Sequence, residues 1–328
     1  MINIPVTDQK NTQQENYNVM VLCGGIGGST LGYVSAGFTV VRSMDSSSKS
    51  NLVHWMNFPS IATLNKPIES MSESDIVEIQ SKIKEDIDIL DVYLPRKQIK
   101  NKFDGQNTFL MNVLRFTYRL KPKIIVFHTE GKWNHGKNVL FANELLALVK
   151  GIGYQVQMET LKASNYRIPQ EKLWSFWIGV RKDIEIKPDF PEVCEKTVST
   201  KEAIEDLLET TSDVEPSRFR LEITKKYFPP GCSLTDVKEV IRQHDLPLHS
   251  AYYKRDRWEE PYYRLPNSTT RPFHPQTDRL LSIQEAKRLQ TFTDDYKCVD
   301  WKEICSSVPP LLIQQVAHCL KSKILDYL

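Results

Sequence analysis

A short glycine-rich run near the amino end of the chain has the residue types and spacing of a cofactor loop. The apolar run Asn18–Cys23 leads into Gly24-Gly25-Ile26-Gly27-Gly28, and a helical pattern follows. Glycines let the backbone turn tightly and approach a ligand, while the first turn of the helix offers N–H groups. Asp45 comes directly after the next strand-like run, where a carboxylate can accept from both hydroxyls of a ribose. Taken alone, the pattern is also typical of a glycine-rich turn in any α/β protein.

The elements that must hold this loop alternate along the chain. Short runs rich in Ile and Val predict strands, and apolar residues at every third or fourth position predict helices. The predicted strands are Asn18–Cys23, Phe38–Met44, Ile87–Leu94, Ile124–His128, Tyr154–Glu159 and Trp174–Val180; the predicted helices are Gly28–Ala36, Thr108–Leu120, Val139–Lys150, Ser282–Phe292 and Pro309–Leu325. This order predicts a doubly wound α/β sheet.

Four stretches, in this order, match the motifs of one family. They are the loop from Cys23 to Gly32 with Ala36-Gly37-Phe38, then Leu120-Lys121-Pro122-Lys123, then Ala163–Gln170 with Ile178-Gly179-Val180-Arg181, and finally Arg279–Phe292 with Ser307-Val308-Pro309-Pro310. They resemble the S-adenosylmethionine loop, the approach to the Glu-Asn-Val motif, the Gln-x-Arg-x-Arg region and the C-terminal motifs of the DNA (cytosine-5)-methyltransferases. The resemblance covers nearly the whole chain, except the first 17 residues and about residues 184–270.

The resemblance implies a Rossmann-like, S-adenosylmethionine-dependent methyltransferase sheet with a second, smaller target-recognition domain. It implies a polar arm at 1–17, a cofactor domain at 18–183 completed by the C-terminal helix 309–328, a target-recognition-like domain at 184–278, and a return segment at 279–308. In this family a thiolate attacks C6 of a cytosine flipped out of the duplex, a glutamate acts at N3, and an arginine holds the exocyclic oxygen. The implied cofactor-binding residues are Gly25, Ile26, Gly27, Gly28 and Asp45.

The residues at the implied catalytic positions are not those that this reaction needs. Pro95 is present, but Arg96 stands where the nucleophilic cysteine is expected. A guanidinium stays protonated and has no lone pair to offer, so it cannot attack carbon. The Glu-Asn-Val position reads His128-Thr129-Glu130, and Lys172 and Trp174 replace two arginines that follow Gln170. Near the C-terminal motif, Cys305 and Ser306 replace a glycine and an asparagine. The sequence therefore predicts a chain with no catalytic residues of its own.

Two positions of the implied cofactor site also lack the residue types that the family has there. Cys23 replaces the aromatic residue that opens the glycine loop in the family, and Pro67 falls where an aspartate is expected after the next strand. The glycines and Asp45 remain. We therefore expect a weakened S-adenosylmethionine site.

The other cysteines offer no evident replacement for the nucleophile. Cys23 lies in the cofactor loop, and Cys298, Cys305 and Cys319 read as small buried apolar residues. Together with His318, these last three also leave a zinc site open as an alternative, although the paired short spacing of zinc ligands is missing. The six cysteines form no C-x-x-C pair and no dense framework, which indicates a reduced, intracellular location, in the cytoplasm or nucleus.

Overall composition is that of an ordinary globular chain, with 40% hydrophobic and 26% charged residues. Near-equal counts of 43 Lys plus Arg and 41 Asp plus Glu do not by themselves announce a nucleic-acid or membrane partner. They conceal an acidic block, residues 184–215 with ten acids against three lysines, and a basic, aromatic block at residues 216–264. The predicted DNA-contacting residues, most of them in the basic block, are Gln170, Lys172, Tyr252, Lys254, Arg255, Arg257 and Arg264.

Two functional readings follow. In the first, the chain is a catalytically inactive homologue of the cytosine-5 DNA methyltransferases and acts as a DNA-binding or regulatory subunit of a methylation or DNA-processing complex. Its partners are then double-stranded DNA and a protein such as an active methyltransferase subunit, with no membrane. In the alternative reading, it is an active methyltransferase subunit whose catalytic groups are completed by a partner chain.

Overall fold

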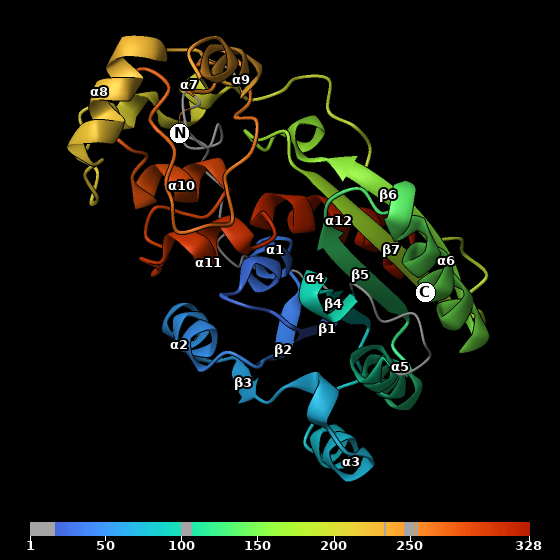
Figure 1. Ribbon diagram of the computed structural model, residues 1–328. Coiled ribbons are helices and arrows are strands. Elements are labelled where there is room, and N and C mark those ends of the chain that lie inside the picture. Colours follow the sequence, from blue (N-terminus) through green and yellow to red (C-terminus); the bar gives the residue numbers. More distant parts are fainter. Residues whose placement is uncertain (1–16, 100–106, 233, 246–252, 254) are drawn as a thin grey trace. The chain divides into compact units, whose positions relative to one another are not determined.

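One seven-stranded sheet organises the larger part of the molecule (Figure 1). The computed structural model describes residues 17–99, 107–232, 234–245, 253 and 255–328. The sheet order is β3-β2-β1-β4-β5-β7-β6. Its strands are β1 (Asn18–Leu22), β2 (Thr39–Asp45), β3 (Ala62–Asn65), β4 (Ile89–Tyr93), β5 (Ile124–Glu130), β6 (Tyr154–Lys162) and β7 (Leu173–Arg181). The first five run parallel, and β7 lies antiparallel between β5 and β6. The predicted doubly wound α/β class is confirmed.

The described residues divide into two compact units. The larger contains the sheet and comprises residues 17–162, 173–193 and 308–328; the smaller comprises residues 163–172 and the described part of 194–307. Helices of the larger unit are α1 (Gly28–Ser35), α2 (Ser48–Asn57), α3 (Glu73–Ser81), α4 (Arg96–Ile99), α5 (Thr108–Leu120), α6 (Val139–Gly151) and α12 (Pro310–Lys323). Those of the smaller unit are α7 (Thr200–Ile204), α8 (Arg218–Tyr227), α9 (Leu234–Gln243), α10 (Ile283–Leu289) and α11 (Trp301–Ser306).

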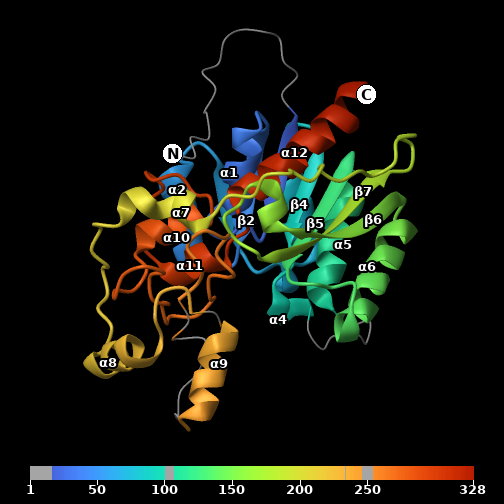
Figure 2. The same cartoon turned by 90° about the horizontal axis from the view of Figure 1, so that it is seen from above.

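Alternate residues of each strand face opposite sides of the sheet, and each side is covered by a different set of helices. Leu22, Val92 and Phe127 belong to one buried apolar cluster with residues of α3, α5 and α6. On the other side α1 and α12 lie next to each other (Figure 2). Their backbones approach closely at Gly32, where an added Cβ would stand 2.6 Å from both Ile313 Cβ and the Pro310 carbonyl oxygen.

Helix α5 shows how local sequence sets these elements. Its apolar residues recur on one face, as the sequence predicted, and Phe109, Val113 and Phe116 are buried there. The Asn107 side chain accepts a hydrogen bond from the Leu110 N–H and caps the first turn. Lys121 takes the left-handed conformation at the other end, and Pro122 prevents continuation. Among the described residues, no helix is long and apolar enough to cross a membrane.

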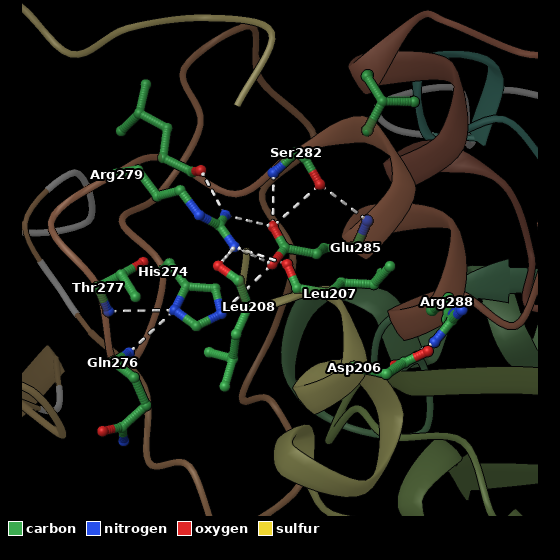
Figure 3. Close-up of polar contacts among 12 residues, drawn as sticks. Asp206, Leu207, Leu208, His274, Gln276, Thr277, Arg279, Ser282, Glu285 and Arg288 are labelled. Carbon is green, nitrogen blue, oxygen red and sulfur yellow. Dashed lines mark hydrogen bonds and ion pairs between the residues drawn. The ribbon is translucent and has the colours of Figure 1, made fainter. Parts of the chain in front are cut away.

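The smaller unit is tied together by the buried carboxylate of Glu285 (Figure 3). The Arg279 guanidinium donates to both oxygens of Glu285, at 2.7 and 2.8 Å, and also to the carbonyl oxygens of Leu207 and Leu208. Ser282 caps α10 and donates to the same carboxylate through its N–H and hydroxyl groups. His274 Nε2 lies 3.3 Å from Glu285 Oε1.

This network lies in a segment whose place in the domain organisation was predicted from the sequence. Residues 279–308 are predicted to be a return segment to the large domain; of the two compact units, the smaller contains residues 279–307 and the larger contains residue 308. Arg279 donates to the carbonyl oxygens of Leu207 and Leu208 in the acidic block, and Arg288 of α10 pairs with Asp206. A reading of helical pattern alone contains no information on these long-range ion pairs.

We predict that Gly32→Ala destabilises the larger unit by about 1–3 kcal/mol, because the added methyl group cannot fit between α1 and α12. Gly151→Ala is the matched control, since Gly151 also lies in a helix but has open space at its Cβ position. Urea denaturation followed by circular dichroism measures both. Equal stability of Gly32→Ala and the wild type would contradict the close packing.

We also predict that acid weakens the fold before the carboxylates titrate. Burial, and then the nearby cations Arg279 and Arg255, lowers the pKa of His274 to about 3, and burial lowers that of His54 to about 4. Unfolded histidines take up protons below about pH 6.5 while the folded ones do not, so stability falls with decreasing pH. His274 alone contributes about 2 kcal/mol of this loss between pH 6.5 and 4.5. His274→Gln should flatten the profile of unfolding free energy over that window; an unchanged slope would contradict the assignment.

Candidate cofactor and catalytic site

The glycine loop leaves the carboxyl end of β1 in a conformation that only a glycine-rich sequence adopts easily. Gly25 has φ 53° and Gly27 φ 102°, both in the left-handed region. The Gly24 N–H donates to the Met44 carbonyl at 3.1 Å, which holds the loop against β2. An added Cβ on Gly24 would lie 2.5 Å from Ser43 Oγ, whereas Gly25 has nothing within 4 Å of that position. The loop is therefore packed on one side and open on the other.

Asp45, at the end of β2, is hydrogen-bonded to this loop. Its carboxylate accepts hydrogen bonds from the N–H groups of Gly25 at 2.9 Å and Ser47 at 2.8 Å. Burial raises the pKa of Asp45, and these N–H donors oppose that rise. A carboxylate has about four lone-pair sites, so acceptor capacity remains for a hydroxyl ligand.

Helix α1 begins at this loop without a side-chain cap. Gly27 is its N-cap, and the first intrahelical bond runs from the Leu31 N–H to the Gly27 carbonyl. The N–H groups of the first turn have no intrahelical acceptor, and the positive end of the helix dipole lies among them. An open glycine, an uncapped helix end and a nearby carboxylate fit a ligand with an anionic end and a ribose, as S-adenosylmethionine has. The structure thus brings together all five predicted cofactor residues.

A buried polar network lies on the α1 side of the sheet. His128 Nε2 is 3.1 Å from Asp91 Oδ2 and 3.3 Å from Ser29 Oγ. Tyr33 donates its hydroxyl to Asp91 Oδ1 at 3.2 Å. All four residues are buried, with at most 2% of their surface exposed to solvent. The imidazole at the expected glutamate position therefore connects β4 and β5 to the first turn of α1.

This network was not predicted from the sequence, although the sequence contained a signal for it. Asp91 stands in the middle of the otherwise apolar strand β4. A buried carboxylate is stable only with hydrogen-bond or ionic partners, so its position in a buried strand required a donor nearby. Identifying His128 as that donor needed the pairing of β4 with β5, which a single sequence does not supply.

Arg96 is the first residue of α4, directly after Pro95 at the end of β4. A Cβ added to Gly131 would lie 3.9 Å from Arg96 Nη1, so the guanidinium stands beside the end of β5. The Tyr93 ring lies 5.7 Å from the His128 ring and 6.4 Å from that of Trp174. Burial, and then the Glu130 and Cys23 groups, raises the pKa of Tyr93. This edge of the sheet therefore presents a cation and aromatic rings.

Burial raises the pKa of four of the thiols, those of Cys23, Cys232, Cys298 and Cys319. Burial, followed by the Asp45 charge, raises the pKa of Cys23 well above its ordinary value. Burial is also the first cause that raises the pKa of Cys232 and of Cys319 to about 11, and it raises that of Cys298. The thiolate is the nucleophilic form, so none of these four thiols is activated. Within the described ranges, no group of three or more His, Cys, Asp or Glu side chains could hold a metal ion.

Glu69 is an acidic residue that the sequence reading did not propose for the cofactor site. It follows β3 and accepts a hydrogen bond from Gln98 Nε2 at 2.7 Å. Its charge is among the causes that raise the pKa of Cys23, so it lies near the glycine loop. The sequence contained a signal for Glu69. The family pattern predicts an aspartate at the position of Pro67, and Glu69 lies two residues further along the chain.

Three of the predicted DNA-contacting residues are buried within the smaller unit. The Gln170 amide donates to the Leu289 carbonyl and accepts from the Leu265 N–H. Lys172 donates to the Cys305 carbonyl at 2.6 Å, and Arg255 pairs with Asp278 at 2.8 Å. These contacts support the fold of the unit, and DNA contact by the three residues stays a prediction.

The remaining predicted DNA-contacting residues are exposed or outside the described residues. Arg257 and Arg264 are exposed, and Arg257 pairs with Glu260 at 2.7 Å. Tyr252 and Lys254 lie outside the described residues.

The fold and the loop together define a methyltransferase of the Rossmann-like, S-adenosylmethionine-dependent class. A sequence profile of the C-5 cytosine-specific DNA methylases matches residues 17–322. The chain belongs to that family, whose members use S-adenosylmethionine to methylate DNA.

Curated relatives agree with the family assignment, and a solved structure has the same fold. The Type II methyltransferase M.XorII of Xanthomonas oryzae pv. oryzae is 27% identical, over 90% of this chain and 82% of its own length. M.Sau96I of Staphylococcus aureus is 26% identical, over 94% and 76%. The Entamoeba histolytica methyltransferase EhMeth has the same fold, with a TM-score of 0.64 and 15% identity over 94% of this chain and 99% of that one.

We predict that His128→Glu, which restores the family's residue type, destabilises the protein by about 3–5 kcal/mol. The new carboxylate would face Asp91 in a buried site without a cation between them. His135→Glu is the control, because His135 is exposed in a loop. Thermal unfolding at pH 7.5 measures the difference. Wild-type stability of His128→Glu would show that the Asp91–His128 pair does not constrain this position.

Proposed function

We propose that the chain is a non-catalytic member of its family and acts as a DNA-binding or regulatory subunit of a methylation or DNA-processing complex. The observation that carries the proposal is Arg96. It directly follows Pro95 at the end of β4, where the resemblance expects the thiolate nucleophile. A protonated guanidinium forms no covalent bond to cytosine C6, so the reaction lacks its first step.

Two other implied catalytic positions, each considered within its own unit, support the same proposal. The His128 imidazole is held by Asp91 and Ser29 within the sheet unit, and the Lys172 ammonium is held by the Cys305 carbonyl within the smaller unit. Burial raises the pKa of the Cys23 and Cys319 thiols, which disfavours the thiolate form at both. Changing one residue would therefore not rebuild the reaction.

We further propose that S-adenosylmethionine binds weakly, through Gly25, Ile26, Gly27, Gly28 and Asp45. The uncapped first turn of α1 would receive its carboxylate, and Asp45 its ribose hydroxyls. When bound, the cofactor supplies an electrophilic methyl group. Weak binding follows from Cys23, which stands where the resemblance predicts an aromatic residue.

The target-recognition-like domain predicted at residues 184–278 is proposed to lie mainly in the smaller unit, which contains its residues from 194 onward. Arg257 and Arg264 are the exposed cations through which it would contact phosphates. The acidic block is proposed to face away from DNA or to dock a protein, because its charge repels phosphate.

A second candidate function is favoured by the intact glycine loop. The loop keeps glycines in the left-handed conformation, and the Gly25 N–H donates to the Asp45 carboxylate. Such a loop is suited to hold the cofactor for a reaction. In this reading, a partner chain contributes the nucleophile, and the pair methylates cytosine.

We predict no methyl incorporation when the purified chain is incubated with labelled S-adenosylmethionine and mixed-sequence double-stranded DNA. Arg96→Cys should stay inactive as well, because His128 and Lys172 remain in place of the family's glutamate and arginine. Robust incorporation by the wild type alone would contradict the proposed function. Activity that appears only after mixing with a candidate methyltransferase chain would support the second candidate.

We predict that S-adenosylmethionine, or its demethylated product, raises the thermal unfolding midpoint. At a hundredfold excess over the dissociation constant the stabilisation is about 2.7 kcal/mol. Asp45→Asn should reduce this effect at a given ligand concentration, while Asp183→Asn, which changes an exposed aspartate, should keep it. No shift at millimolar ligand would contradict cofactor binding and favour a purely structural role.

A further inference from the structure

Helix α2 presents an apolar face to solvent. Leu52, Trp55 and Met56 are 57%, 53% and 40% exposed. Their spacing places them on one side of the helix. The opposite side is buried through Ser50, Asn51 and His54. Surface helices normally turn charged or polar residues outward, so an outward Leu-Trp-Met face indicates a contact surface.

The buried side of α2 fixes this face in position. His54 Nε2 lies 2.9 Å from the hydroxyl oxygen of Thr30 on α1. The centres of the His54 and Phe58 rings are 5.1 Å apart. Asn65 of β3 donates to the Ser48 hydroxyl at the start of the helix. Because β3 is the outermost strand on this side, α2 lies at the end of the sheet (Figure 1). A face that is already ordered loses little entropy when it is covered.

The segment of chain that carries this face contains few charged residues. Residues 46–65 contain no aspartate or glutamate and a single lysine, Lys49. A two-fold interface places the same patch of both subunits together, so it must be complementary to itself. A patch with an apolar centre and one peripheral cation meets that condition, because no like charges meet at its centre.

We propose that a second copy of this chain packs on this face, with the two α2 helices antiparallel across a two-fold axis. Antiparallel packing brings the first turn of each helix, which carries Lys49, beside the last turn of the other. The last-turn carbonyl oxygens carry a partial negative charge that attracts this cation. Trp55 is then the central anchor, since tryptophan is the residue type most enriched among interface hot spots.

The size of the face limits the area of this contact. A tryptophan buries about 150–250 Å² in a contact, and a standard interface covers about 800 Å² on each partner. One ten-residue helix supplies only part of that area. The proposed interface is therefore smaller than a standard one, and the test covers a wide range of protein concentration.

Sedimentation equilibrium of the full chain from about 1 to 100 μM tests this proposal. The wild type should pass from monomer to dimer, and Trp55→Glu should weaken the association at least tenfold. Tyr118→Glu is the matched control, because Tyr118 is an aromatic residue on α5 that is 70% exposed. A wild type that stays monomeric would overturn the proposal, as would a Trp55→Glu variant that dimerises normally. Circular dichroism melting establishes that each variant is folded.

Iodide quenching of tryptophan fluorescence gives an independent readout. Trp133, Trp174, Trp177 and Trp301 are at most 4% exposed, and Trp258 is half-buried, so quenching reports mainly on Trp55. Quenching should decrease as the wild-type concentration rises, and Leu52→Glu should abolish this dependence. Dimerisation without any change in quenching would place the interface elsewhere and overturn the proposal.

Discussion

A carboxylate within a buried strand must be hydrogen-bonded, and Asp91 imposes this condition on the centre of the larger unit. Tyr33 satisfies one of its oxygens, and His128 lies beside the other. Through Ser29, the same imidazole reaches the helix that starts at the glycine loop. The geometry of the loop and the residue type at position 128 are thus coupled by one buried charge.

This coupling bears on the chemistry. The resemblance implies that the family's reaction uses a carboxyl group at the position that His128 holds here. A second carboxylate facing Asp91 would require two like charges to share a buried site, which is costly unless one of them is protonated. A histidine at position 128 is therefore compatible with the buried Asp91 carboxylate, whereas a second carboxylate at that position would be costly. Arg96 is a separate change, since it lies at the edge of the sheet beside the end of β5.

Periodicity predicted the strands and the long helices with small errors in their bounds. The strand predicted at Asn18–Cys23 ends at Leu22, because Cys23 already has φ 57°. The short strand β3, helix α2 and helix α3 were not predicted, since their residues are polar and only partly buried. The cofactor loop was predictable because its residues are close in sequence. Asp45 is only 20 residues from Gly25, whereas the Asp91–His128 contact spans 37 residues and depends on strand pairing.

Connectivity has a further consequence. Between residues 17 and 328 the chain passes from one unit to the other four times, at 162/163, 172/173, 193/194 and 307/308. One of the visits to the smaller unit is a ten-residue excursion between β6 and β7. A single proteolytic cut therefore cannot release either unit, and neither can be exchanged between relatives as one continuous cassette. Recombination of one whole unit with that of a homologue must preserve four junctions at once.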